Sequence, residues 1–544
     1  MKLHKFFVIS IFFLLSGFSL LAGQEALKSV EEEYYNFLFL QGITERSYLA
    51  YRTLSDSVWV LPEGMSHPWE NNYLGEQRKL TEKVALKIYG PELFTSFNSA
   101  APYGQNDGVL WQGRGFNASL TGGVRLEAYG IELTVKPQVT FSQNRSFKPM
   151  TSSYDSKYGY FWGYEQNEGI DAPQRFGNKV FFDWSLGDTE IRYTWKNLTI
   201  GFGTQAVWLG PAYMNPMLHS NNAAPYPKLD IGLRRTSATI PKLGWYIGDI
   251  EFRIWTGYLS ESDYFDNDSS NDHNMIHGLA FSYAPSFLPG LVLSVNRTCL
   301  VKWDWRNLRY IIPLEKNTEE DQKMSLAAIW SFPQAGFEVY GEMGLDDFVP
   351  DGVLGYIRYP FHTLIYTLGL KKNVSFSPSV KGQIIFEYSN FEMSQDFQFQ
   401  WAYNFYFHHQ ITQGYTNRGQ FIGAGLGSGG NSQFLGFNLY YPKGSTLFFI
   451  NRNNPDNNYI YKNAINESAK GGELGKQNWS KWKTNFILGV STVYFINSQI
   501  QITGQFAYDL LINPAYTNTH GTAPKGQDVF IHNFCLSAGC KFIF

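Results

Sequence analysis

The chain has 544 residues, of which 17% are charged and 17% aromatic, and its 44 basic residues nearly balance its 47 acidic ones. This near-balance of positive and negative charges argues against nucleic acid as a partner. The mean hydropathy is below zero, which excludes a protein built from membrane-spanning helices. Abundant rings and amides together are typical of a transmembrane β-barrel, where lipid-facing and lumen-facing residues alternate between two aromatic girdles.

The first 22 residues predict a secretory signal peptide. Lys2 and Lys5 precede an unbroken apolar stretch that begins at Phe6, and a small residue, Ala22 or Gly23, ends it. The alternative is an N-terminal membrane anchor, but the stretch is shorter than the roughly 20 residues that a spanning helix needs. We therefore expect an exported protein.

A helical pattern follows the signal peptide. Apolar residues recur at helical spacing between Val30 and Gln41, and a second such pattern runs from Thr44 to Leu54. A linker rich in Pro, Gly, Asn and Trp follows at 62–76. We expect residues 23–95 to form a periplasmic helical segment and linker, ahead of a barrel formed by residues 96–544.

From about residue 108 onward the apolar pattern has a period of two. Ile131–Val139 and Gln499–Asp509 each turn aliphatic side chains to one face and polar side chains to the other. This alternation predicts an all-β, antiparallel outer-membrane β-barrel, with outer-membrane lipid against the apolar face.

The last segment of the chain, 529–544, alternates in the same way and ends at the aromatic residue Phe544. It resembles the last strand of bacterial outer-membrane barrels, so we expect the barrel-assembly machinery to recognise it. A core strand of a soluble sandwich could show the same alternation.

Turn lengths give the barrel an orientation, because outer-membrane barrels have short periplasmic turns and long extracellular loops. Lys196-Asn197 and Asn497-Ser498 read as tight turns, which we place in the periplasm. We place the long polar segments outside the cell: 143–178, 260–274, 451–482 and 512–527. The predicted strand from Leu198 to Val207 then climbs outward.

The stretch WLGPAYMNPMLHSNNAAPYP at 208–227 therefore begins at the outer end of a strand. Aromatic faces with directional amides and hydroxyls suit sugars, whose rings have apolar C–H faces and hydroxyl edges. The candidate polysaccharide-binding residues are Trp208, Tyr213, Asn215, His219, Ser220, Asn221, Asn222, Arg234 and Arg235. The alternative is a loop folded into the barrel mouth to constrict or plug it, and the two interpretations are compatible.

Other motifs have weaker claims to chemistry. The glycine run at 423–430 matches a dinucleotide fingerprint formally, but a strand-like segment follows where a helix is needed. Acidic residues at 263–272 could hold Ca²⁺, although they lack the EF-hand pattern, and the adjacent His408 and His409 point to opposite faces of a strand. The three cysteines suggest no disulfide framework.

The sequence contains neither HExxH nor GxSxG. We expect no enzymatic activity, no catalytic residue, no cofactor and no metal site. An outer-membrane hydrolase with a Ser-His pair assembled from distant strands remains an alternative.

Three stretches resemble the Wzi-type capsule assembly proteins of bacterial outer membranes. They are YGQNDGVLWQGRG at 103–115, continuing at 122–144; FGTQAVWLGPAYMNPMLHSNNAAPYP at 202–227; and GYTNRGQFIGAGLGSG at 414–429. The resemblance implies a barrel of 18 strands with a periplasmic helical bundle and a mouth closed by loops. This sequence departs from the family pattern at Leu209, where the family has Trp, and at Ala212, where the family has Gly. The resemblance supplies no polysaccharide-contacting residue that can be carried over to this sequence.

The resemblance also implies a lectin that anchors polysaccharide. We therefore expect an outer-membrane protein that binds capsular or other extracellular polysaccharide at the cell surface. The alternative function is a porin or substrate-specific channel, because lumen-facing Gln, Glu and Lys suit a pore equally well.

Overall fold

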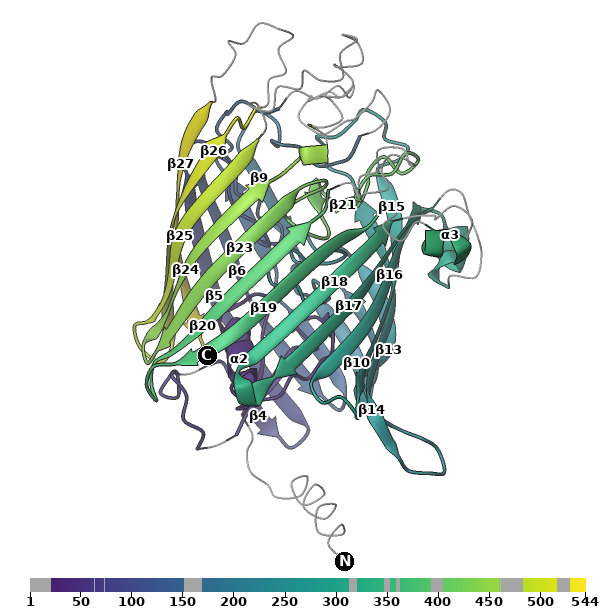
Figure 1. The fold of residues 1–544 in the computed structure, drawn as a ribbon, viewed down its shortest axis with the longest axis vertical. Helices are drawn as coiled ribbons and strands as arrows, with labels where there is room; N and C mark the ends of the chain where they lie inside the picture. The colour runs from purple at the N-terminus through teal and green to yellow at the C-terminus, as the bar shows by residue number, and fades with distance from the viewer. Residues whose placement is uncertain are drawn as a thin grey trace, which may run out of the picture.

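The structure, a computed structural model, describes residues 21–62, 64–72, 74–150, 169–312, 320–346, 353–358, 363–392, 405–458, 460, 483–515 and 529–544. Most described residues lie in one sheet whose strands tilt around a closed barrel (Figure 1). No helix in these ranges is long and apolar enough to span a bilayer. Residues 1–20 of the predicted signal peptide lie outside the described residues.

The sheet contains 21 strands, each antiparallel to its neighbours. They are β4 (Arg78–Thr81), β5 (Val84–Asn98), β6 (Gly115–Ala128), β7 (Ile131–Val135), β8 (Gln138–Ser142), β9 (Phe181–Ser185), β10 (Glu190–Trp195), β11 (Leu198–Gly203), β13 (Lys228–Thr239), β14 (Tyr246–Ser260), β15 (His273–Pro285), β16 (Leu291–Lys302), β17 (Asp321–Phe332), β18 (Phe337–Asp346), β19 (Ile365–Ser375), β20 (Lys381–Asn390), β23 (Asn431–Tyr441), β24 (Gly444–Asn454), β25 (Thr484–Phe495), β26 (Ile500–Ile512) and β27 (Phe530–Ile543). Short elements outside the sheet are α2 (Val30–Phe39), α3 (Val353–Arg358), the 3₁₀ helices η1 (Trp305–Ile311) and η2 (Pro333–Ala335), and the strands β1 (Leu21–Gln24), β2 (Tyr51–Arg52), β3 (Val58–Leu61), β12 (Trp208–Leu209), β21 (Thr416–Asn417) and β22 (Gln420–Phe421).

These strands make an 18-stranded barrel, as expected. β7 and β8 both pair with β6 and are two halves of one barrel strand, and β9 and β10 are two halves of the next. β27 closes the ring by pairing with β5 between Tyr89 and Asn98. β4 pairs with the preceding part of β5, Val84–Leu86, beyond the end of β27. β5 begins at Val84, so the barrel starts earlier in the chain than the predicted boundary at residue 96.

The wall has the two faces that the period-two pattern predicts. Large apolar side chains such as Phe202, Leu229 and Leu293 are exposed on the outer face. Charged and amide side chains are buried on the inner face, among them Arg192 and Glu387. The period-two arrangement fits lipid outside and a polar lumen inside.

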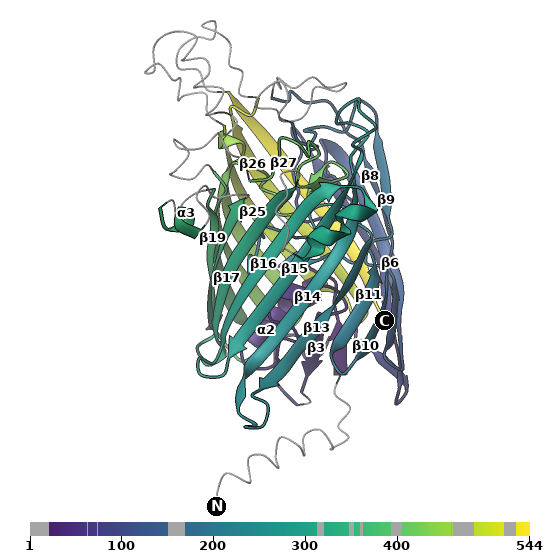
Figure 2. The same ribbon diagram turned by 90° about the vertical axis from the view of Figure 1, so that its right-hand side faces the viewer.

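The two ends of the barrel also differ as predicted. Short turns, including Lys196-Asn197, join strands at the end where α2 and the C-terminus lie, and longer segments join them at the other end (Figures 1 and 2). Segments 143–178, 451–482 and 512–527 lie partly outside the described residues, and their described parts are at this outer end.

The N-terminal segment, residues 21–61, lies inside the lower half of the lumen instead of forming a module ahead of the barrel (Figure 1). Ser29 caps α2 by accepting a hydrogen bond from the Glu32 N–H, and three glutamates occupy its first turn, where they favour the helix dipole. Its apolar side chains pack against the inner wall at Tyr440 and Phe495.

The helix predicted from Thr44 to Leu54 does not form. The N–H groups of Leu49, Ala50 and Tyr51 donate to the carboxylate of Glu251 on β14, at distances of 3.0 to 3.2 Å. A wall glutamate thus holds this backbone in a non-helical conformation. Long-range hydrogen bonds override the local helical pattern.

Candidate functional site

The segment that joins β11 to β13, residues 204–227, turns into the lumen and is called the inserted segment below. Its strand β12 pairs with β2 of the N-terminal segment, with Trp208 opposite Arg52 and Leu209 opposite Tyr51. The outer insertion and the N-terminal segment therefore meet inside the barrel. This is the plug that sequence analysis considered as the alternative to an exposed sugar-binding loop.

The aromatic side chains of the inserted segment are covered to different extents by protein. Trp208 is fully buried, and its indole N–H donates to the carbonyl of Ala212 at 3.1 Å. The Lys28 ammonium lies 3.7 Å from the ring centroid of Tyr213, and Arg52 lies over Trp208. Trp208 therefore offers no open face for stacking on a sugar, whereas Tyr213 is only partly buried.

The carboxylate of one wall glutamate anchors the middle of the inserted segment. Glu387 on β20 accepts the N–H groups of Tyr213, Met214 and Asn215 and the hydroxyl of Tyr340. The Met214 and Asn215 bonds measure 3.0 and 2.9 Å. Glu251 binds Leu49–Tyr51 of the N-terminal segment in the same way, so in each of the two pieces inside the lumen a wall glutamate accepts consecutive backbone N–H groups.

His219 is buried at the centre of an aromatic cluster. Its Nε2 lies 2.6 Å from the Tyr226 hydroxyl, and its ring meets Trp255 edge to face. Burial lowers the pKa of His219 to about 3, so the imidazole is neutral at physiological pH. A neutral, fully enclosed histidine serves packing here and does not face a ligand.

We expect acid to destabilise the barrel through His219. The unfolded chain takes up a proton near the usual pKa of about 6.5, whereas the folded chain does so only near 3. The contribution is therefore complete above about pH 6.5 and falls by about 2 kcal/mol by pH 5. Gel-shift heat denaturation at pH 7 and pH 5 should show a larger loss for wild type than for His219→Gln, and equal losses would contradict this.

The polar residues of the inserted segment join it to other outer segments. Ser220 donates its hydroxyl to the carbonyl of Gly423 at 2.6 Å, and the Asn222 side-chain amide donates to the carbonyl of Phe421 at 3.0 Å. The carbonyl of Asn221 accepts the N–H of Gly108 at 2.7 Å. These three residues link the inserted segment to the first outer loop at Gly108 and to residues 421–423.

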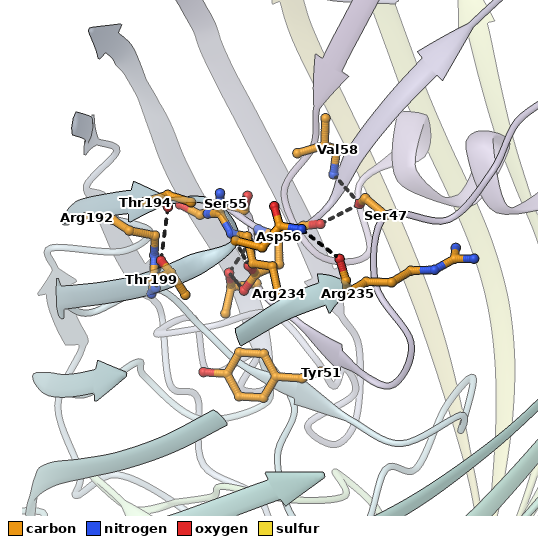
Figure 3. Close-up of polar contacts among 12 residues, drawn as sticks. Ser47, Tyr51, Ser55, Asp56, Val58, Arg192, Thr194, Thr199, Arg234 and Arg235 are labelled. Carbon is orange, nitrogen blue, oxygen red and sulfur yellow. Dashed lines mark hydrogen bonds and ion pairs between the residues drawn. The ribbon is translucent and has the colours of Figure 1, made fainter. Parts of the chain in front are cut away.

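Arg234 and Arg235 lie near the periplasmic end of β13 and not at the mouth, because the Arg234 N–H donates to the carbonyl of Asn197 in the short β10–β11 turn. Figure 3 shows both arginines beside Ser47, Ser55 and Asp56 of the N-terminal segment. Arg234 forms ion pairs with Asp56 and Glu132, and Arg235 pairs with Asp249. A register shift after Leu233 bulges β13, and both arginines contact the N-terminal segment. The prediction that they belong to the outer site is corrected, because they hold the N-terminal segment.

A cavity of about 420 Å³ lies in the outer half of the lumen, beside the inserted segment. Its amides come from the first outer loop and from β5, β24, β25 and β26: Asn98, Gln105, Gln112, Asn451, Asn453, Asn485 and Gln505. Rings of Phe94, Tyr103, Tyr213, Phe434 and Phe449 complete the lining. The period-two pattern of residues 499–509 predicts Gln505 on a lumen face, but it does not reveal the cavity.

Several polar atoms of the cavity have no protein partner. Among the described residues, Gln105 Nε2, Asn453 Oδ1, Asn485 Oδ1 and Asp509 Oδ1 are buried without a hydrogen bond. Burial also raises the pKa of Asp107 to about 7, so this carboxyl group is partly protonated near neutrality. Amides and rings with unused hydrogen-bonding capacity suit a hydroxyl-rich ligand.

The remaining motifs of the sequence are structural where they are described. The glycine run at 423–430 is followed by β23 and not by a helix, and Gly423 lets the carbonyl of Met217 approach closely. Asp266 and Asp268 accept hydrogen bonds from their own loop. The described ranges contain no group of three His, Cys, Asp or Glu residues placed to hold a metal.

Comparison with known proteins agrees with this architecture. Residues 89–302 match the model of the family described as capsule assembly protein Wzi. The structure is similar to Wzi of Escherichia coli, described as an outer-membrane protein involved in group 1 capsule assembly and a carbohydrate-binding β-barrel, with 13% identity and a TM-score of 0.53 over 84% of this chain and 85% of that one. No curated protein sequence matches the chain.

Other outer-membrane barrels are more distant in structure. OccD3 of Pseudomonas aeruginosa shares 11% identity with a TM-score of 0.40, over 86% of this chain and 93% of that one. OprB of Pseudomonas putida shares 10% identity with a TM-score of 0.37, over 84% and 94%. The described barrel and the family match place the chain in the outer membrane.

Proposed function

Residues 89–302 match the Wzi-type capsule assembly family, and on that premise we propose that this barrel binds extracellular polysaccharide at the cell surface and anchors it there. The observation that carries the proposal is the amide-lined cavity in the outer half of the lumen. Its unpartnered amide and carboxylate atoms can exchange hydrogen bonds with sugar hydroxyls, and its rings can pack on sugar C–H faces.

The candidate residues of the inserted segment then act indirectly. Tyr213 and Met214 form one wall of the cavity, and Glu387 fixes the backbone of both. Trp208, Asn215, His219, Ser220, Asn221 and Asn222 hold the inserted segment in place. We propose that they position the binding surface and do not contact the glycan themselves.

A diffusion pore is the alternative function, and the filling of the lumen argues against it. One buried hydrophobic cluster includes Tyr51 of the N-terminal segment, Leu209 of the inserted segment and Tyr406 of an outer segment. A second buried cluster packs α2 against the wall below it. We propose a non-enzymatic anchor with a filled lumen and with outer-membrane lipid around its wall. We also propose that the barrel-assembly machinery recognises β27, which ends one residue before Phe544.

Cavity variants test the proposal. Replacing Asn485 or Gln105 with Ala should weaken binding of the organism's purified surface polysaccharide about fivefold each, since a hydrogen bond contributes about 1 kcal/mol. Gln499→Ala, in an exposed periplasmic turn, is the matched control and should bind as wild type does. Biolayer interferometry on immobilised protein measures this, and failure of wild type to retain the polysaccharide would refute the proposal.

A further inference from the structure

The barrel wall is interrupted in its outer half, between β9 and β14. β9 pairs with β8 alone, so its other edge has no strand partner in the described sheet. β11 ends at Gly203, and β13 begins only at Lys228, opposite Gly257 of β14. The outermost part of β14, Tyr258–Ser260, therefore pairs with β15 but not with β13. This interruption is called the lateral gap below.

Two residues of the β21–β22 hairpin bridge the lateral gap from the inside. The Arg418 N–H donates to the carbonyl of Ser260 at 2.8 Å, and the Asn417 side chain accepts the Ser260 N–H at 3.0 Å. On the other side, the Arg418 guanidinium donates to the carbonyl of Trp184 and pairs with Asp183 on β9. Arg418 holds a left-handed φ of 52°, a conformation that costs energy for a residue other than glycine.

Two hollows of different chemistry meet at the lateral gap, where they share Pro227 and Tyr258. The upper hollow, about 720 Å³, is lined by polar and aromatic residues that include Trp184, Glu261 and Asp263. One carboxylate oxygen of Glu261 is buried there without a hydrogen bond among the described residues. Hydroxyl groups of a saccharide would supply the missing partners.

The lower hollow, about 820 Å³, lies on the outer face of the wall, between η1 and strands β11, β13 and β14. Its lining is apolar at Phe202, Leu229 and Leu308, and all three side chains are exposed to the bilayer side. Trp305, 79% exposed, lies at its rim. The lining also includes Lys228 and the exposed Asp304–Arg306 ion pair, so an acyl chain would enter the hollow along its apolar side, at Phe202 and Leu229.

We propose that the lateral gap and its two hollows bind an acylated glycan, with the acyl chain against the outer wall and the first sugars at Asn417 and Arg418. The continuity of an apolar hollow open to lipid with a polar hollow at the mouth selects a molecule that is itself amphiphilic. This inference rests on the proposed function, since it assigns a lipid-bearing end to the polysaccharide that the barrel anchors. The gap lets one molecule occupy the bilayer and the mouth together.

Photo-cross-linking tests the proposal. The protein is reconstituted in phosphatidylethanolamine nanodiscs with a maltohexaose that carries a diazirine-labelled palmitoyl chain, and labelled peptides are mapped by mass spectrometry. We expect labelling to concentrate around Leu229 and Trp305, and Leu229→Trp or Met275→Trp, which fill the lower hollow, to reduce it at least fivefold. Leu293→Trp, at a lipid-facing site elsewhere on the wall, is the matched control and should leave labelling unchanged.

Two outcomes of the cross-linking experiment would contradict the lateral site. Even labelling around the wall, or equal labelling by a diazirine phosphatidylcholine without sugars, means annular lipid only and overturns the inference. Gel-shift heat denaturation verifies that each variant is folded, and the two filling variants are independent of one another. Binding of unacylated surface polysaccharide is measured on the same preparations: loss in wild type refutes the proposed function, whereas retention with unspecific labelling refutes only the lateral site.

Discussion

Replacing Glu387 with alanine is expected to detach the inserted segment from the wall and to convert a closed barrel into a leaky one. The substitution leaves three consecutive backbone N–H groups and the Tyr340 hydroxyl without their acceptor. Each buried group left unsatisfied costs about 1–3 kcal/mol, so the loss of all four hydrogen bonds favours movement of the inserted segment away from the wall. Planar-bilayer recordings should show near-silence for wild type and frequent openings for Glu387→Ala.

The control for this experiment is another wall glutamate. Glu127 has one ion-pair partner, Arg125, and a partly exposed side chain, so Glu127→Ala should remain closed. Glu387→Gln keeps one acceptor oxygen and should give an intermediate result. Recordings in which Glu387→Ala is as silent as wild type would show that the carboxylate does not hold the plug.

The second large effect is expected at Asp56, in the N-terminal segment. Asp56 accepts hydrogen bonds from Arg234 and Arg253, each at 2.9 Å, and it is almost completely buried. Figure 3 shows Asp56 beside Arg234. Burial alone would raise its pKa, but Arg253 and Arg234 hold the pKa of Asp56 well below its usual range. Asp56→Ala should cost about 3–5 kcal/mol, because it leaves buried guanidinium groups short of a counter-charge.

Limited trypsin digestion in detergent measures this release. Wild type should resist cleavage after Arg46 and Arg52, which are ion-paired inside the lumen, whereas Asp56→Ala should be cut there while the barrel stays intact. Asp304→Ala removes an exposed pair with Arg306 and should change nothing. Equal resistance of wild type and Asp56→Ala would contradict the assigned role of the arginine cluster.

The barrel wall was predictable because its signals are local. Alternation along a strand reports which face meets lipid, and a tight turn such as Lys196-Asn197 reports the periplasmic end without reference to the rest of the chain. The adjacent positions Arg234 and Arg235 both reach the N-terminal segment because β13 bulges there, and this bulge is invisible in the periodic pattern. Their partners lie in a segment distant in sequence.

The contents of the lumen were not predictable, because they depend on single long-range contacts. The carboxylate of Glu251 organises Leu49–Tyr51 from about 200 positions away, and this prevents the helix that the local pattern favours. The cavity also depends on long-range contacts, because Gln105 and Asn485 line the same cavity only when the ring of strands closes. Inward-facing amides on successive strands were its one signal in the sequence.

The central claim is that this barrel retains polysaccharide at the cell surface. The most direct test measures how polysaccharide divides between cells and growth medium in a strain from which the protein is deleted. We predict a several-fold increase in the medium, reversed by wild type but not by a variant that combines Gln105→Ala with Asn485→Ala. An unchanged distribution between cells and medium after deletion would contradict the account.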